Sequence, residues 1–209
     1  MSSSKQDRLP VAVITGAAQG IGRAIAIKGY LLALGDLMIN QNQLQLVVDE
    51  CIEAQRSAML NRSMSPRVLP VICDVSDERQ VEALVQTAVT ELDGIDVMVA
   101  NAGIYRGIPL LDINVKGVLY SYRAAARAMI PRGGGRIVGA CSAAGKSGFP
   151  LEGAYCASKF AVRGLTQAAA REWGQHGITV NTYAPGPTDT EMWNKVVMGV
   201  APERAEASI

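Results

Sequence analysis

Tyr155 and Lys159 are the residues of this chain whose types and spacing best suit proton transfer. They lie four positions apart in a proline-free stretch rich in Ala, Leu and Val, from Ala154 to Trp173, which favours a helix. Residues four apart share one helix face, so the ammonium would lie beside the phenol. A neighbouring cation lowers the pKa of a tyrosine from about 10 towards the pH at which a general acid or base works best. The pair predicts acid–base chemistry, although such a pair also occurs by chance on solvated helix faces.

Ser142 would bring a hydroxyl to the same place. It lies thirteen positions before Tyr155 and follows the apolar run from Arg136 to Cys141, which we expect to form a strand. Open α/β sheets bind ligands at the carboxyl ends of their strands. A hydroxyl there can stabilise negative charge on a carbonyl oxygen, whereas a lone serine after a strand is also a common turn former.

A glycine-rich turn indicates a phosphate site. Thr15–Gly22 comes directly after the apolar segment Val11–Thr15 and opens a helix, with glycines at 16, 20 and 22. Glycines in this context let backbone N–H groups approach a pyrophosphate at the positive end of a helix dipole. An ordinary glycine turn would show the same pattern by itself.

These features resemble the short-chain dehydrogenase/reductase family. The resemblance is carried by the strand-end Ser142, by Tyr155-Cys-Ala-Ser-Lys159 and by the spacing Gly-x-x-x-Gly-x-Gly in the first turn. Ala100–Gly103 is similar to the family's Asn-Asn-Ala-Gly motif with its first Asn replaced. Pro185–Thr190 resembles the family's Pro-Gly loop at the nicotinamide.

The resemblance implies an NAD(P)-dependent oxidoreductase that interconverts a ketone or aldehyde and an alcohol. Tyr155 would donate or accept the proton, and Lys159 would lower its pKa and bind the nicotinamide ribose. Ser142 would hydrogen-bond the carbonyl oxygen, and Asn114 would connect Lys159 to solvent through water. Besides Tyr155 and Lys159, the expected cofactor contacts are Gly16, Gln19, Gly20, Ile21, Gly22, Asn40, Asp74, Val75, Asn101, Gly103, Pro185, Gly186, Thr188 and Thr190.

The choice between NAD and NADP depends on the end of the second strand. We expect that strand at Leu37–Asn40, which places Asn40 at the adenosine ribose and leaves no carboxylate there. Because an acid selects the free 2′-hydroxyl, its absence slightly favours NADP over NAD. Asp74 and Val75 would contact the adenine edge, but Asp74 could equally be a helix-entry residue.

The expected fold class is α/β: a Rossmann-type doubly wound parallel sheet of about six strands with helices on both faces, in one domain over residues 1–209. Strand-like and helix-like segments alternate along the chain, as in βαβ units. The expected strands are 11–15, 37–40, 68–73, 97–101, 136–141 and 179–183, and the expected helices are 20–34, 44–58, 112–129 and 154–173, with another helix capped by Ser76.

Composition excludes several other classes of protein. With 20 Lys+Arg, 19 Asp+Glu and 49% hydrophobic residues, the chain reads as a globular protein that binds neither nucleic acid nor membrane. Its four cysteines lack C-x-x-C pairing and a histidine cluster, so we expect buried free thiols and no metal site. The polar N-terminus suggests no signal peptide or membrane span, and hence a cytoplasmic setting.

The chain departs from the family pattern in two places. Only ten residues separate Gly103 from Asn114, where the family carries a further helical segment, and little follows Thr190, so a seventh strand and the usual C-terminal oligomer interface are not expected. The sequence therefore does not decide whether the chain forms a homo-oligomer. A rival interpretation of the function is a shortened cofactor-binding remnant, or a noncatalytic NAD(P)-binding protein, with little turnover. Asn181–Trp193 resembles acetoin and butanediol dehydrogenases and related carbonyl reductases, and Met192 and Trp193 could line a substrate pocket or belong to the core.

Overall fold

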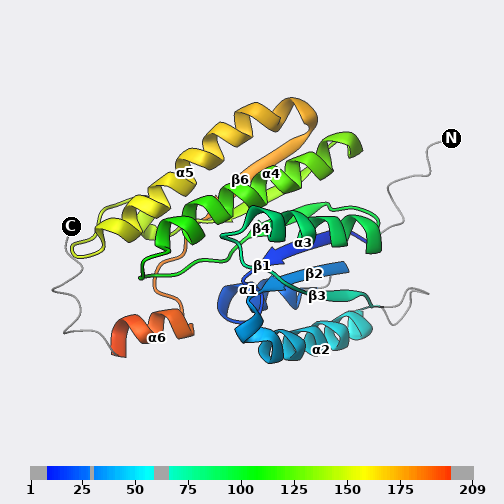
Figure 1. The fold of residues 1–209 in the computed structure, drawn as a ribbon, viewed down its shortest axis with the longest axis horizontal. Coiled ribbons are helices and arrows are strands. Elements are labelled where there is room, and N and C mark those ends of the chain that lie inside the picture. The colour runs from blue at the N-terminus through cyan, green and yellow to red at the C-terminus, as the bar shows by residue number, and fades with distance from the viewer. Residues whose placement is uncertain (1–8, 29–30, 59–65, 199–209) are drawn as a thin grey trace.

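The computed structural model describes residues 9–28, 31–58 and 66–198 of the 209-residue chain. In these ranges six strands form one sheet with helices on both faces (Figure 1). All neighbouring strands are parallel and follow the order β3-β2-β1-β4-β5-β6, which confirms the predicted doubly wound α/β sheet. The strands are β1 (Val11–Thr15), β2 (Leu31–Asp36), β3 (Val68–Ile72), β4 (Val97–Ala100), β5 (Gly135–Ala140) and β6 (Ile178–Tyr183).

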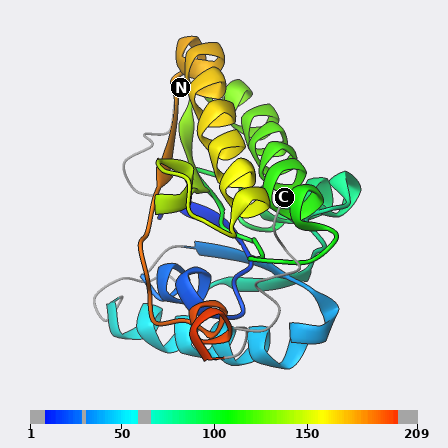
Figure 2. The same cartoon turned by 90° about the vertical axis from the view of Figure 1, so that its left-hand side faces the viewer.

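Two helix layers enclose the sheet (Figures 1 and 2). Successive strand residues point to opposite faces, so Val13 joins one hydrophobic cluster with Leu84 and Tyr122, and Ile14 joins another with Leu44. One layer holds α3 (Glu78–Glu91), α4 (Gly117–Met129) and α5 (Gly153–Trp173), and the other holds α1 (Gly20–Ala26) and α2 (Gln41–Ala58). A last helix, α6 (Glu191–Met198), follows β6.

The predicted second strand was wrong. The run Leu31–Asp36 forms β2, between β1 and β3, whereas Met38–Asn40 forms a short 3-10 turn, η1, before α2. Accordingly α1 stops at Ala26 instead of continuing to residue 34. Periodicity alone cannot assign a short apolar run to a helix or a strand. Leu31–Asp36 forms a strand because it lies inside a parallel sheet that is covered on both faces.

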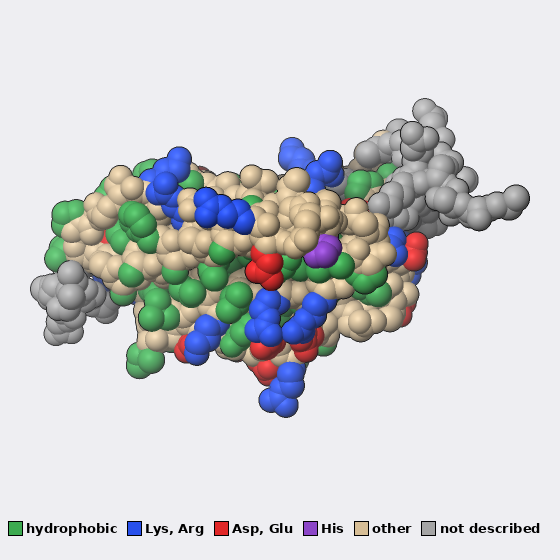
Figure 3. Space-filling view, turned by 90° about the horizontal axis from the view of Figure 1, so that it is seen from above, with side chains coloured by type: hydrophobic (Ala, Val, Ile, Leu, Met, Phe, Trp, Pro, Cys, Tyr) green, Lys and Arg blue, Asp and Glu red, His purple; other side chains and the backbone are tan. Residues whose placement is uncertain are grey.

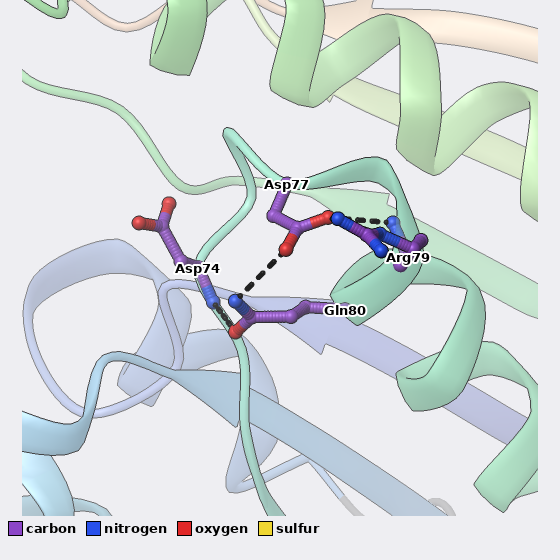
Figure 4. Close-up of polar contacts among 4 residues, drawn as sticks. All are labelled: Asp74, Asp77, Arg79 and Gln80. Atoms are coloured by element: carbon purple, nitrogen blue, oxygen red, sulfur yellow. Dashed lines mark hydrogen bonds and ion pairs between the residues drawn. The ribbon is translucent and has the colours of Figure 1, made fainter.

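The start of α3 also differs from the prediction. Asp77, not Ser76, is the N-cap: its carboxylate accepts a hydrogen bond from the Arg79 N–H at 2.9 Å. Figure 4 shows Gln80 bridging this cap to the Asp74 backbone, whose N–H donates to Gln80 Oε1 at 2.9 Å. The Asp74 carboxylate instead accepts bonds from the Ser76 N–H and hydroxyl, at 2.9 and 2.7 Å. Asp74 therefore shapes the turn before the helix but does not cap it.

The surface over α4 and α5 carries both signs of charge among hydrophobic side chains (Figure 3). All four cysteines are free and buried, as expected. Within the described ranges, no helix combines the length and apolar character of a membrane span, and no cluster of His, Cys, Asp or Glu is suited to a metal ion.

Candidate active site

A cavity of about 380 Å³ opens where β1, β4, β5 and β6 end. Parallel strands present their carboxyl ends to the same sheet edge, where the loops that follow them converge. The site residues expected from sequence that line this cavity are Gly16, Gln19, Gly20, Ile21, Asn101, Gly103, Ser142, Tyr155, Lys159, Pro185, Gly186, Thr188 and Thr190. Gly22, Asn40, Asp74, Val75 and Asn114 lie outside its lining.

Ser142 and Tyr155 meet in this cavity. Ser142 lies two residues after the end of β5 and caps a 3-10 turn, Ala143–Gly145 (η4), by accepting a bond from the Ala144 N–H at 3.2 Å. Its side chain lies beside the phenol of Tyr155, which α5 supplies. Burial raises the pKa of Tyr155 above its usual value, and the neighbouring Ser142 hydroxyl opposes that shift. The two hydroxyls can together address one substrate oxygen.

Lys159 lies one helical turn further along α5 and is almost completely buried. Its ammonium donates to the Ala140 carbonyl at 2.9 Å, and Nζ lies 5.5 Å from the centroid of the Tyr155 ring. Burial lowers the pKa of Lys159 to about 8. The expected lowering of the Tyr155 pKa by this lysine is not found, because desolvation of the phenol is the largest influence on that group.

Asn114 lies beside Lys159 despite the short connection from Gly103. It sits in a π-helical turn, Asp112–Lys116 (η2), that leads directly into α4, and it is fully buried. Its amide accepts from the Ile104 N–H and donates to the Ile104 carbonyl, both at 2.8 Å, and donates to Ser158 at 3.2 Å. The side chain thus fixes the 103–104 backbone in the cavity wall, with both amide hydrogens used and one acceptor position left on Oδ1.

The first turn forms a cradle that only glycine permits. Gly16 has φ of 64°, and a Cβ there would lie 2.8 Å from the Ala102 Cα. A Cβ on Gly22 would lie 2.1 Å from the Gly16 carbonyl oxygen, so α1 packs directly on the turn. Backbone N–H groups at the start of α1 are left open to the cavity side, as a pyrophosphate requires. The residues present fit a dinucleotide cofactor.

Tyr183, at the end of β6, is a site residue that sequence analysis missed. Its hydroxyl donates to Asn101 Oδ1 at 2.6 Å. The Asn101 amide in turn donates to the Thr15 and Gly16 carbonyls, both at 2.9 Å. Tyr183 therefore orients the amide that holds the phosphate turn to β4.

Asp36 is a second missed residue, and it corrects the expectation for Asn40. Asp36 ends β2, so a carboxylate does stand at the position assigned to the adenosine ribose. It accepts bonds from the Ala18 and Leu37 N–H groups at 2.8 Å and from the Asn40 amide at 2.7 Å. Asn40 supports this carboxylate from η1 instead of ending the strand.

The loop after β6 borders the cavity and contacts both the Ser142 segment and the glycine turn. The Ala143 N–H donates to the Pro185 carbonyl at 2.9 Å, which ties this loop to the Ser142 segment. A Cβ on Gly20 would have the Thr190 side chain, at 3.5 Å, as its nearest neighbour. Met192 and Trp193 of α6 line the cavity, so the pocket interpretation of this pair holds.

Comparison with known proteins agrees with this architecture. The family model for short chain dehydrogenases matches residues 10–200. The chain therefore belongs to the short-chain dehydrogenase/reductase family, whose members are oxidoreductases acting on CH–OH and C=O groups.

Individual relatives are similar over most of the chain. A short-chain dehydrogenase/reductase of Armillaria gallica is 42% identical over 210 aligned residues, covering 93% of this chain and 77% of the relative. A diacetyl reductase of Staphylococcus epidermidis is 39% identical, covering 88% and 74%. The crystal structure of an NAD⁺-bound xylitol dehydrogenase superposes with a TM-score of 0.81 at 30% identity, covering 92% of this chain and 76% of that one.

Proposed function

We propose that the chain is an NAD-dependent oxidoreductase that interconverts a ketone and a secondary alcohol, with Tyr155 as proton donor and acceptor. The observation that carries this proposal is the convergence of Ser142, Tyr155 and Lys159 in one cavity, facing the glycine turn. The names of two relatives, a diacetyl reductase and an L-2,3-butanediol dehydrogenase of Corynebacterium glutamicum, support a ketone and alcohol pair.

The proposed roles follow from the contacts of each side chain. When bound, the dinucleotide supplies or accepts the hydride. In the reductive direction Tyr155 donates its phenolic proton to the substrate carbonyl oxygen, and Ser142 donates a hydrogen bond to the same oxygen where charge develops. Lys159 brings a buried ammonium close to the Tyr155 ring, which stabilises the phenolate after proton transfer.

Asp36 supports NAD over NADP. The preference for NADP assumed no acid at the end of the second strand, and β2 ends in one. A carboxylate can accept hydrogen bonds from a free 2′-hydroxyl and repels a 2′-phosphate. The Asp36 carboxylate already accepts hydrogen bonds from three donors. Its two oxygens offer about four acceptor positions, so it can accept one more bond from a ribose hydroxyl.

The test is cofactor oxidation by the purified chain with NADH and with NADPH, on a panel of ketones. Turnover with NADH on at least one ketone, lost by at least a thousandfold in Tyr155→Phe with the dissociation constant for NADH nearly unchanged, is the expected result. Tyr120→Phe is the matched control, because Tyr120 lies on α4 outside the cavity lining. Turnover retained in Tyr155→Phe contradicts the assignment.

Thermal unfolding separates catalysis from binding alone. A cofactor that binds only the folded chain raises its apparent stability. A higher melting temperature with NADH, without turnover of any ketone, would instead indicate a cofactor-binding protein.

A further inference from the structure

The substrate end of the cavity combines a largely apolar wall with two carboxylates, Glu152 and Glu191. Its wall includes Tyr105, Phe149, Met192 and Trp193, and the last three are 44%, 39% and 38% exposed. Glu152 lines the same wall, next to the turn of α5 that carries Tyr155. An apolar wall accommodates a carbon skeleton, whereas a carboxylate there requires a hydrogen-bond donor.

The backbone before α5 is shaped to present Glu152. Leu151 has φ of 63°, a left-handed conformation that costs a branched residue free energy and that clusters at functional sites. The turn is closed by the Glu152 N–H, which donates to the Phe149 carbonyl at 3.2 Å. Glu152 occupies the N-cap position of α5, yet its side chain makes no capping hydrogen bond. The carboxylate is therefore not used to begin the helix.

Tyr105 fixes Glu152 relative to the reacting group. Burial and, next to it, the neighbouring Glu152 carboxylate raise the pKa of Tyr105 to about 12, which places this carboxylate beside the Tyr105 phenol. Its ring packs on that of Tyr155, with centroids 5.0 Å apart and planes tilted by 55°. The Arg106 guanidinium lies 5.3 Å from the Tyr105 centroid, in a cation–π contact. The carboxylate and the catalytic phenol are thus linked through one aromatic ring.

We propose that Glu152, positioned by Tyr105, binds a hydroxyl group of the substrate, so that the preferred substrates are diols and hydroxyketones with an apolar body. This inference rests on the proposed function. An ionised carboxylate can only accept hydrogen bonds, so it attracts a hydroxyl and repels an ether or second carbonyl oxygen at the same place. Glu152 is a specificity-determining residue in this scheme and takes no part in proton transfer.

Three alcohols of similar size test the inference. The full chain is assayed with NAD on vicinal cyclohexanediol, on its monomethyl ether and on cyclohexanol. At the second carbon the diol carries a hydrogen-bond donor, the ether carries only an acceptor, and cyclohexanol carries neither. We expect kcat/KM for the diol to exceed that for the other two by about tenfold or more, because a site that hydrogen-bonds a substrate hydroxyl discriminates against analogues that lack it. Equal kcat/KM for the diol and the ether would overturn the inference.

Glu152→Gln changes the acceptor into a group that can also donate, at constant shape. The ratio of diol to ether kcat/KM should fall about tenfold in this variant, with the ether gaining in absolute terms. Glu172→Gln, an exposed change near the far end of α5, is the control and should leave the ratio unchanged. An unchanged ratio in Glu152→Gln would overturn the inference.

Tyr105→Phe provides a second variant should Glu152→Gln fail to fold. It keeps the ring on Tyr155 and removes the hydroxyl that positions Glu152, so the ratio of diol to ether kcat/KM should fall by a smaller factor. An unchanged ratio again contradicts the inference.

If none of the three alcohols is oxidised, the proposed function is wrong for these substrates. The melting temperature of the chain with NAD and each alcohol then decides about Glu152: a larger rise with the diol supports hydroxyl recognition, and equal rises reject it.

Discussion

The two halves of the sheet hold their functional groups in different ways. On the side of β4, β5 and β6, the proposed catalytic side chains come from α5 and from the segment after β5, and α5 is 21 residues long. On the side of β1, β2 and β3, the contacts to a dinucleotide come from backbone turns and one carboxylate, and α1 has only seven residues. The catalytic half is thus built from side chains on a long helix, and the cofactor half from loop geometry.

This difference predicts where mutations act. Changes in the catalytic half should reduce turnover with little effect on cofactor binding, and changes in the cofactor half should alter affinity and cofactor choice. Residues that connect the halves should affect affinity moderately.

After Tyr155→Phe, the largest effect is expected for Ser142→Ala in the catalytic half. Removing a hydrogen-bond donor to the developing oxyanion should lower kcat by roughly 100-fold to 1000-fold. Steady-state kinetics at saturating NADH measure it, with Ser147→Ala in the same exposed loop as control. Because Ser142 also caps η4, a melting curve is needed to separate lost stability from lost catalysis. A change in kcat of less than tenfold in folded protein would contradict the role.

Asp36→Asn tests the cofactor half. Removing the negative charge should lower the ratio of kcat/KM for NADH to that for NADPH by about 10-fold to 100-fold, since repulsion of a 2′-phosphate is lost. Asp49→Asn on the exposed face of α2 is the control. The prediction fails if the ratio is unaltered.

Tyr183→Phe tests the connection between the halves. Without the hydroxyl, Asn101 Oδ1 loses its donor, and only the two bonds from its amide nitrogen to the Thr15 and Gly16 carbonyls still orient the side chain, so the phosphate turn is held less firmly. The dissociation constant for NADH should rise by roughly tenfold while kcat at saturation stays nearly constant. Fluorescence titration measures the constant, and Tyr120→Phe serves as comparison. A lower kcat with unchanged affinity would place Tyr183 in the chemistry instead.

The smallest effect concerns Lys159 and pH. Its pKa is lowered to about 8 in the folded chain from an ordinary value of 10.5, so between these values the unfolded chain binds more protons. The contribution of Lys159 to the free energy of unfolding should therefore rise with pH there, by about 1 kcal/mol between about pH 8 and 9. The buried thiols of Cys51 and Cys73, whose pKa values are raised from 9.0 to about 11 and about 12, act in the opposite direction from about pH 8 upwards, so the Lys159 contribution is measured as a difference between variants.

Denaturant titrations of the wild type and Lys159→Met isolate this contribution. The variant should lack the rise, and Lys146→Met, an exposed change near Ser142, should keep it. Identical pH slopes in the wild type and Lys159→Met would show that the ammonium is not desolvated.

Sequence analysis succeeded where a chemical motif fixed the register of an element. Tyr155 and Lys159 identified α5, and the glycine turn identified the junction of β1 and α1. It failed between residues 27 and 40, where Leu31–Leu34 suits a helix and a buried strand equally well. The misplaced strand hid Asp36, and so the expected cofactor changed with it.

Other site residues could not be found from sequence because they belong to no motif. Glu152, Tyr105 and Tyr183 act through contacts between segments far apart in the chain, which only the fold reveals. Asn114 illustrates the opposite case: its motif was recognised from the sequence, although only ten residues separate it from Gly103. It lies in the π-helical turn Asp112–Lys116, where its side chain is buried and bonded to Ile104.

Because α1 has only seven residues, cofactor binding should change the local stability of this helix more than that of α5. A helix of two turns has few backbone hydrogen bonds to hold it, and helices this short depend on tertiary contacts for their stability. Local opening is therefore easier at the phosphate turn than along α5. A dinucleotide that contacts both walls of the cavity would stabilise α1 more than α5. Cofactor binding should therefore slow amide hydrogen exchange mostly in α1 and little in α5.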